Sequence, residues 1–227
     1  MTRTPTTAST GPRTRPGSRR EDIAAAAIEL FLDRGVAATR VEDILAAAGG
    51  VSVGSFYHHF RDKLGLAATV YLEHLQRFHH DLLVELDRHA RTEDAVRGLV
   101  LAYLRWAGAD PRAMGYLHRC REPNVAEISE GEEARLKQFF YGRLGDWLDE
   151  RAATGELRAL PHEHSLALWL GPAEQLIRAA IDPSEHFTAP EPDALGAHLA
   201  RAERVLADAA WEALRRPAPA DDAGQAR

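Results

Sequence analysis

Residues 41–66 read VEDILAAAGGVSVGSFYHHFRDKLGL, and this stretch says more about the fold than any other part of the chain. It contains two short helical patterns separated by Gly49-Gly50, a pair that stops a helix and forms a turn. The second pattern is brief, with hydroxyl and imidazole groups on one side and aromatic rings on the other. Because a short helix presented after a turn fits the major groove of DNA, the stretch predicts a helix-turn-helix.

Helix start signals extend this pattern in both directions. Four polar residues of the kind that cap helices stand before apolar helical runs: Ser18, Thr39, Ser52 and Asp62. Glu21 and Glu42 follow the first two of them and complete capping boxes, and Gly35 is expected to end the first helix at its C′ position. The predicted helices here are 18–34, 39–48, 52–60 and 63–90.

The rest of the chain continues with helical signals and shows no convincing strand. Five further helices are expected: 92–108, 110–121, a long helix that follows Pro123 and is best defined over 132–153, 161–181 and 193–215. A loop is expected over 182–192, where three prolines occur. The chain is therefore predicted to be all-α, with about nine helices and no internal repeat.

Composition limits the class of protein. The net charge is −6, but residues 1–63 carry nine basic and seven acidic residues, whereas the remainder carries 19 and 27. The first part is thus the one suited to meet phosphate, although five arginines within residues 3–20 supply most of its positive charge. No apolar run spans a bilayer, no secretory signal is visible and Cys120 is the only cysteine, so a cytoplasmic protein without disulfides is expected.

The second helix of the pair has two distinct sides. Phe56 and Phe60 lie four residues apart and are expected to pack on the first helix, and Gly54 is expected to allow close approach to the preceding helix. The groups left outside suit phosphates, base edges and thymine methyls: Ser52, Val53, Ser55, Tyr57 and His58. Thr39 at a helix N-terminus and Lys63 in the first turn of the long helix are expected to meet phosphates.

Each of these residues, taken singly, also fits an ordinary solvated helix. Taken together with the capping boxes and the glycine turn, they resemble the N-terminal signature of the TetR-type bacterial regulators, most specifically in YHHF followed by a charged residue and Lys63. The resemblance covers residues 18–66, and LALWLGPAEQ at 166–175 is similar to one subgroup. It implies operator contacts, mostly to phosphates, by Thr39, Ser52, Ser55, Tyr57, His58 and Lys63.

One residue departs from the family pattern. The family usually has a single glycine where this chain has Gly49-Gly50. The extra residue either lengthens the turn or shifts the register of the helix before it. The angle between the two helices, and with it the set of base contacts, depends on which of these occurs.

The resemblance also implies a homodimer formed through the last two long helices. Apolar residues recur on one face of 161–181 and of 193–215 and are candidates for this interface: Leu166, Trp169, Leu170, Ala173, Ile177, Leu199, Ala202 and Leu206. The same pattern fits packing within one chain. A dimer would place two reading helices about 34 Å apart, as a two-fold operator requires.

Aromatic and polar side chains between the helix-turn-helix and these helices suit an apolar small-molecule pocket. The candidates are Tyr103, Trp106, His118, Phe140 and Trp147. Each of them also fits an ordinary helical core. The resemblance implies that an inducer binds in this region.

The expected organisation has four parts: a disordered arm over 1–17, a DNA-binding domain over 18–64, a ligand-binding and dimerisation domain over 65–216 and a disordered tail over 217–227. The arm either reaches a minor groove through its arginines or is an untethered terminus. No phosphate loop or nucleophile elbow is present, so neither an enzyme nor a cofactor is expected. His118 and Cys120 alone are weak evidence for a metal site, and none is predicted.

The hypothesis is a repressor that binds a double-stranded DNA operator as a homodimer and is released by a small apolar or aromatic ligand, with no membrane partner. A small-molecule-binding helical protein without DNA function is an alternative, motivated by the extra glycine. A transcriptional activator with the same reading helix is another.

Overall fold

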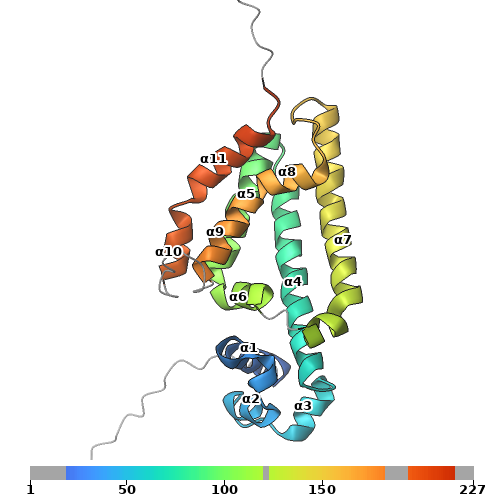
Figure 1. Ribbon diagram of the computed structural model, residues 1–227, viewed down its shortest axis with the longest axis vertical. Helices are drawn as coiled ribbons and strands as arrows, with labels where there is room; N and C mark the ends of the chain where they lie inside the picture. Colours follow the sequence, from blue (N-terminus) through green and yellow to red (C-terminus); the bar gives the residue numbers. More distant parts are fainter. Residues whose placement is uncertain (1–18, 120–122, 182–193, 218–227) are drawn as a thin grey trace, which may run out of the picture.

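The computed structural model describes residues 19–119, 123–181 and 194–217. These residues form eleven helices and no strand apart from an isolated bridge between Leu157 and Arg215, which confirms the all-α class. The helices are α1 Arg19–Ala38, α2 Val41–Ala47, α3 Val53–His59, α4 Lys63–Asp87, α5 Thr92–Ala109, α6 Pro111–Arg119, α7 Pro123–Ala153, α8 His162–Trp169, α9 Gly171–Ile181, α10 Leu195–Ala200 and α11 Glu203–Leu214. Figure 1 shows α1–α3 gathered at one end, with α4 running from them through the rest of the molecule. We call α1–α3 the head and α4–α11 the body.

The head closes around a small apolar core. Its most deeply buried side chains are at most 2% exposed and include Ile23, Phe31, Ile44, Phe56 and Leu66. Tyr116 of α6 and Val125 of α7 belong to the same cluster, although they lie far along the chain. The domain boundary expected between residues 64 and 65 therefore does not coincide with a break in side-chain packing. The first turns of α4 are part of the head core.

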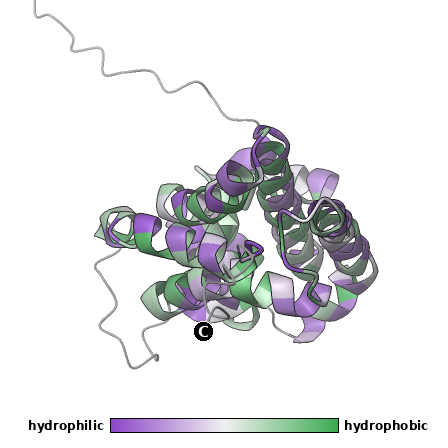
Figure 2. Cartoon of the chain, turned by 90° about the horizontal axis from the view of Figure 1, so that it is seen from above, coloured by the Kyte–Doolittle hydropathy of each residue, from purple (hydrophilic) through white to green (hydrophobic). Residues whose placement is uncertain are grey.

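The body is built around the long helices α4, α5 and α7. Its larger core lies between these helices and α8–α11, and α5 is covered by α4 on one side and by α10 and α11 on another. In the view from above, the hydrophobic sides of the helices face one another and hydrophilic residues lie outward (Figure 2). Among the described residues, no helix is both long and apolar enough to cross a bilayer.

Local signals set the helix ends in the head. The side-chain oxygens of Ser52 and Asp62 accept backbone N–H groups three residues later, at 3.2 Å and 2.7 Å, and so cap α3 and α4 as predicted. Gly35 interrupts α1 with a φ of 81°, a conformation that glycine adopts without strain. Ser18, the arm over 1–17 and the tail beyond residue 217 lie outside the described residues.

Two predicted long helices are broken in the structure. The segment 161–181 forms α8 and α9, which meet at Leu170, because Pro172 has no N–H to continue a helical ladder and instead stands in the first turn of α9. The segment 193–215 likewise forms α10 and α11, separated at Arg201 and Ala202. By contrast, α7 runs without a break from Pro123 to Ala153, in agreement with the long helix expected after Pro123.

Candidate nucleic-acid interface and inner pocket

The aromatic side of α3 anchors it to the head. Phe56 is fully buried and Phe60 is 4% exposed, with ring centroids 5.9 Å apart, as the sequence predicted. The guanidinium of Arg20 lies 5.5 Å from the centroid of the Phe60 ring and also pairs with Glu73 of α4. These contacts hold α3 in one orientation on α1 and α4.

The opposite side of α3 is open. Val53 and Tyr57 are 55% and 57% exposed, and the Tyr57 ring is held edge-on to Phe56 at 5.2 Å. The other predicted DNA-contacting residues of this segment are exposed or, for Ser55, partly exposed: Ser52, Ser55 and His58. A Cβ placed on Gly54 would meet no heavy atom within 4 Å, so the expected close approach of this residue to α2 does not occur.

Gly49 and Gly50 form the turn before α3. Gly49 and Gly50 have φ values of 84° and 75°, in the left-handed region that favours glycine. The N–H groups of Gly50 and Val51 both donate to the carbonyl of Leu45, at 2.9 Å and 3.1 Å. Ile44 and Leu45 remain in the head core, so α2 keeps its apolar side inward and the turn accommodates the added residue.

Thr39 takes a different role from the one predicted. It is 1% exposed, and its hydroxyl donates to the carbonyls of Gly35 at 2.7 Å and Leu30 at 3.3 Å. Arg40 rather than Thr39 is the N-cap of α2, without a side-chain cap, so the predicted capping box does not form. Because the hydroxyl is used inside the head, it does not make the phosphate contact that the sequence suggested.

Lys63 is held by the backbone. Its Nζ donates to the carbonyl of Thr39 at 2.7 Å and to that of Ala37 at 3.1 Å. These carbonyls offset the unfavourable position of a cation in the first turn of α4, which the sequence had attributed to a phosphate. The two bonds use two of the three ammonium donors, so a phosphate contact remains compatible with them.

Two cations near α2 and α3 were not singled out from the sequence. Arg40 is exposed directly before α2. Arg61 follows Phe60, the C-cap of α3, and its side chain is 95% exposed, 4.0 Å from Asp62. Only their position in the sequence could have marked them as candidate DNA contacts, because both lie in the short connections that flank the helix-turn-helix.

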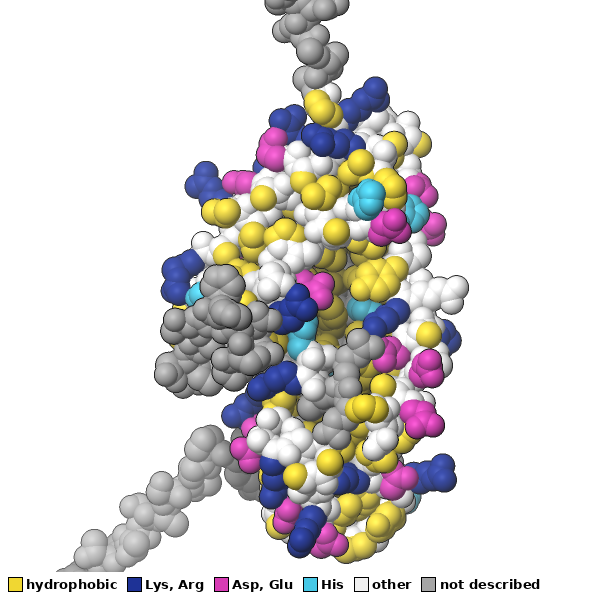
Figure 3. Space-filling model, viewed as in Figure 1, with side chains coloured by type: hydrophobic (Ala, Val, Ile, Leu, Met, Phe, Trp, Pro, Cys, Tyr) yellow, Lys and Arg dark blue, Asp and Glu magenta, His cyan; other side chains and the backbone are white. Residues whose placement is uncertain are grey.

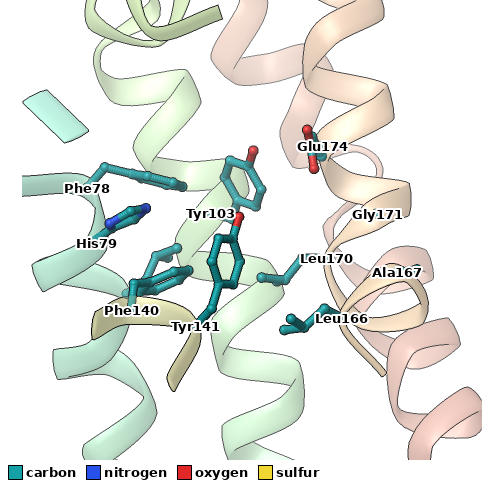
Figure 4. Close-up of a pocket in the computed structure, with 11 residues that line it drawn as sticks. Phe78, His79, Tyr103, Phe140, Tyr141, Leu166, Ala167, Leu170, Gly171 and Glu174 are labelled. Carbon is teal, nitrogen blue, oxygen red and sulfur yellow. The ribbon is translucent and has the colours of Figure 1, made fainter. Parts of the chain in front are cut away.

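A pocket of about 180 Å³ opens into the body between α4, α5, α7, α8 and α9. Figure 3 shows it as a hollow with an apolar floor and charged and histidine side chains around its rim. Of the predicted ligand residues, Tyr103 and Phe140 line it (Figure 4). Trp106 lies behind the wall, with its ring 5.0 Å from that of the lining residue Phe78.

The two remaining ligand candidates separate. His118 lies on α6, burial lowers its pKa, and it is not among the residues that line the pocket. Trp147 is 5.3 Å from Trp169, packs on the body core and lines a different, polar pocket of about 270 Å³. Trp147 is therefore no part of the inner pocket, contrary to the sequence-based expectation.

The structure also corrects most of the expected dimer face. Five of its residues are at most 8% exposed within a single chain: Trp169, Leu170, Ala173, Ile177 and Leu199. The Trp169 indole N–H donates to the carbonyl of Val96 at 2.9 Å, and Leu166 and Leu170 line the inner pocket. The sequence offered packing within one chain as the other explanation of the apolar periodicity. That explanation accounts for the apolar face of these residues. Ala202 and Leu206 are partly exposed and stay predictions.

His79 is one of the pocket residues that sequence reasoning missed. It is 7% exposed, and its ring is stacked on Phe140 with centroids 4.1 Å apart and planes 3° apart. Burial, and secondly the charge of Lys137, lower its pKa to about 4, so the imidazole is neutral at pH 7. The one available signal was a histidine at an apolar position of the long helix. No group of three metal-ligating residues occurs in the described parts of the chain, and Cys120 lies outside them.

The architecture has known counterparts. Residues 23–70 match the family described as bacterial regulatory proteins, tetR family. The chain is 36% identical over 87 residues to the HTH-type transcriptional repressor KstR2 of Mycolicibacterium smegmatis, a match that spans 38% of this chain and 42% of that protein's length. The solved structure of the ketosteroid transcriptional regulator KstR2 of Mycobacterium tuberculosis has a TM-score of 0.65 at 20% identity, covering 89% of this chain and 98% of that one.

A second solved structure, the transcriptional regulator FadR of Bacillus subtilis in complex with stearoyl-CoA, has a TM-score of 0.62 at 15% identity and covers 83% of this chain and 98% of that one. At this level of identity the two structures show a shared fold. The family match over residues 23–70 covers α2 and α3 and therefore the whole helix-turn-helix. Through its helix-turn-helix segment, residues 23–70, the chain thus matches the tetR family of bacterial regulatory proteins.

Proposed function

We propose that this protein is a ligand-responsive transcriptional repressor that binds a two-fold DNA operator as a homodimer. The observation that carries the proposal is the construction of α3. A seven-residue helix is anchored by buried aromatic rings on one side and leaves Val53 and Tyr57 more than half exposed on the other. Exposed large side chains on an otherwise well-packed helix favour a binding surface.

In this proposal α3 enters the major groove. Ser52, Tyr57 and the flanking cations Arg40 and Arg61 contact phosphates, and Lys63 does so through its remaining donor. The residues that read bases are Val53, Ser55 and His58. With the Gly49-Gly50 turn in place, this side of α3 stays exposed, which supports DNA binding over a head without DNA function.

Control by a ligand is supported by helices that are shared between head and body. One end of α4 places Leu66 in the head core, and further along the same helix His79 lines the inner pocket. The short helix α6 contributes Met114 to the body core and Tyr116 to the head core. A ligand that favours one arrangement of α4 and α6 would change the position of the head by differential affinity alone.

The relatives agree with this proposal. One is named a transcriptional repressor and another a transcriptional regulator in complex with an acyl-CoA. We extend to this chain the principle of control by a small molecule, and leave the chemistry of the ligand to the residues of its own pocket.

For the dimer, we propose the outward side of α8–α11. This side carries exposed apolar residues, including Val205 at 68% and Leu168 at 42%, beside the partly exposed Ala202 and Leu206. Sedimentation velocity should show a dimer for the wild-type chain and a monomer for Val205→Asp. Val84→Asp on α4, which is 55% exposed in the wild type, is the matched control and should remain dimeric.

The DNA-binding part is tested by fluorescence anisotropy with duplex DNA from upstream of the protein's own gene. Tyr57→Ala and Arg61→Ala should each lower affinity about tenfold, with Arg61→Ala also reducing the salt dependence by about one phosphate contact. Phe139→Ala, at an exposed aromatic residue of α7, is the control and should bind as the wild type does. Absence of salt-sensitive binding by the wild-type chain would overturn the proposal.

A further inference from the structure

We infer that the inner pocket binds a ligand of about one ring that carries a carbonyl group, and that the hydroxyl of Tyr103 donates a hydrogen bond to the carbonyl oxygen. The inference rests on the proposed function and deepens it, because it names the chemical class of the ligand. Three observations carry it: an unused hydroxyl, the polar groups beside that hydroxyl and the size of the pocket.

Tyr103 presents a buried hydrogen-bond donor to the pocket. This residue of α5 is 6% exposed and lines the pocket (Figure 4), and its hydroxyl has no hydrogen-bond partner among the described residues. Its oxygen is not one of the fully enclosed, unpartnered side-chain atoms of the described chain, so it keeps surface that a ligand can reach. Burial, and secondly the charge of Glu174, raise the pKa of Tyr103, so this hydroxyl keeps its proton at neutral pH. A buried donor without an acceptor is unfavourable, and a ligand that supplies an acceptor is therefore favoured.

The other polar side chains that line the pocket do not supply this acceptor. The Nδ1 atom of His79 is enclosed by its neighbours, and the imidazole is hydrogen-bonded to the backbone of Leu136. Tyr141 is 46% exposed, so its hydroxyl can bond to solvent. Glu174 is also exposed, and no hydrogen bond joins it to Tyr103 in the described structure. Among the described lining residues, the Tyr103 hydroxyl is thus the buried donor that a ligand has to satisfy.

A carbonyl group matches this single donor. A carbonyl oxygen accepts and brings no donor of its own, whereas a ligand hydroxyl brings an O–H that also needs an acceptor inside the pocket. Charges of both signs act on the pocket residues. Glu174 and Arg178 act on Tyr103, and Lys137 acts on His79. The hydrogen-bonding group of the ligand, rather than its net charge, therefore defines the class.

The size of the pocket favours one ring. Its volume is about 180 Å³, and an apolar cavity of roughly 150 Å³ holds a molecule the size of benzene. Phe78, Tyr103 and Phe140 bring aromatic rings to this space from three different helices (Figure 4). The Phe78 and Tyr103 rings are 4.9 Å apart and tilted by 51°, so they present an edge and a face to a planar guest. One ring with a short substituent that carries the carbonyl group fits this space.

Three probes with one carbon skeleton separate these contributions. Acetophenone carries a carbonyl group, 1-phenylethanol carries a hydroxyl in the same place and ethylbenzene carries neither. Titration calorimetry on the full chain should show acetophenone binding at millimolar concentration or below, and more tightly than 1-phenylethanol. Equal or tighter binding of 1-phenylethanol overturns the inference, and so does the failure of acetophenone to bind at millimolar concentration.

Tyr103→Phe keeps the ring and removes the donor. In this variant the affinity of acetophenone relative to that of ethylbenzene should fall about tenfold, the effect of losing roughly one hydrogen bond. Because the same two probes are compared in both proteins, the difference in their hydration cancels. Tyr141→Phe, at the exposed tyrosine of the same pocket, is the matched control and should keep the wild-type ratio. A Tyr103→Phe variant that folds and keeps the wild-type ratio contradicts the inference.

Infrared spectroscopy on the wild-type chain tests the same hydrogen bond without a variant. The stretching frequency of acetophenone labelled isotopically at the carbonyl carbon should be lower in the complex than in hexane, because a hydrogen bond weakens the C=O bond. A frequency in the complex equal to that in hexane overturns the inference. This measurement decides if circular dichroism shows that Tyr103→Phe does not fold.

DNA binding, measured on the same samples, separates this inference from the proposed function. Tight operator binding by a chain that binds none of the three probes overturns the ligand class alone. Binding of acetophenone that depends on Tyr103, by a chain that shows no affinity for DNA, supports the ligand class and overturns the proposed regulator.

Discussion

The hydroxyl of Tyr116 donates a hydrogen bond of 2.9 Å to the carbonyl of Ala67, which joins α6 to α4 inside the head core. Tyr116 is fully buried, and its ring is stacked on Phe31 of α1 with centroids 6.2 Å apart. Met114, on the same short helix, is part of the body core. A displacement of α6 relative to either core therefore disturbs the other, so this helix links the body core to the head core.

Tyr116→Phe tests the strength of this link. The ring can keep its place in the core, but the bond to Ala67 is lost, so the free energy of unfolding should fall by about 1 kcal/mol. Urea denaturation followed by circular dichroism measures this change. Tyr57→Phe removes an exposed hydroxyl and should change stability by less than about 0.5 kcal/mol. Equal stability of Tyr116→Phe and the wild type would contradict the importance of the bond.

The turn before α3 provides a second prediction. Gly49→Ala and Gly50→Ala should each destabilise the protein by about 1 kcal/mol, because alanine at a positive φ is strained even where space is free. Gly54→Ala is the matched control, since its site inside α3 is equally open and has no positive φ. That substitution should be neutral or stabilising by up to about 1 kcal/mol. Thermal unfolding of the three variants gives the comparison.

Lys63 is expected to contribute to both stability and DNA binding, and Arg61 to DNA binding alone. Lys63→Met removes two bonds to backbone carbonyls, so it should lower the free energy of unfolding by roughly 1–3 kcal/mol and weaken DNA binding as well. Arg61→Met, at an almost fully exposed side chain, should weaken DNA binding and leave stability unchanged. Denaturation and anisotropy on the same preparations distinguish the two roles. A Lys63→Met protein as stable as the wild type would show that the carbonyl contacts matter little.

Stability should also depend on pH through His79. Its pKa in the folded protein is about 4, below the ordinary value of 6.5. The stabilisation from a neutral buried ring is therefore complete above pH 6.5 and is lost as the pH falls from 6.5 toward 4. Between pH 7 and pH 5 this amounts to roughly 2 kcal/mol of unfolding free energy.

His79→Phe should remove that share of the pH dependence in urea titrations at pH 7, 6 and 5, and His80→Phe should leave it in place. His118, whose pKa is also lowered by burial, contributes with the same sign and persists in both variants. An unchanged pH dependence in His79→Phe would contradict the assignment.

The head was predictable because its signals act over a few residues. Ser52 and Asp62 cap helices through the N–H groups three positions ahead, and Phe56 and Phe60 share a face through helical spacing alone. The contacts that the sequence did not reveal here join residues further apart in the chain. The acceptor of the Thr39 hydroxyl and the two carbonyls that hold Lys63 depend on how the chain reverses after α1.

In the body, the contrast between local sequence signals and contacts set by tertiary structure is greater. Periodicity marked the faces of Trp169 and Ile177 as apolar, but it carries no information about which partner covers them, and the covering comes from the same chain. The inner pocket brings His79, Tyr103 and Phe140 together from three helices, and that depends on where the helices cross. The all-α class and the DNA-reading helix thus follow from short-range patterns in the sequence. Tertiary packing decides the shape of the pocket and the contribution of α6 to both cores. The neighbours of a buried side chain depend on where helices that are distant in sequence cross.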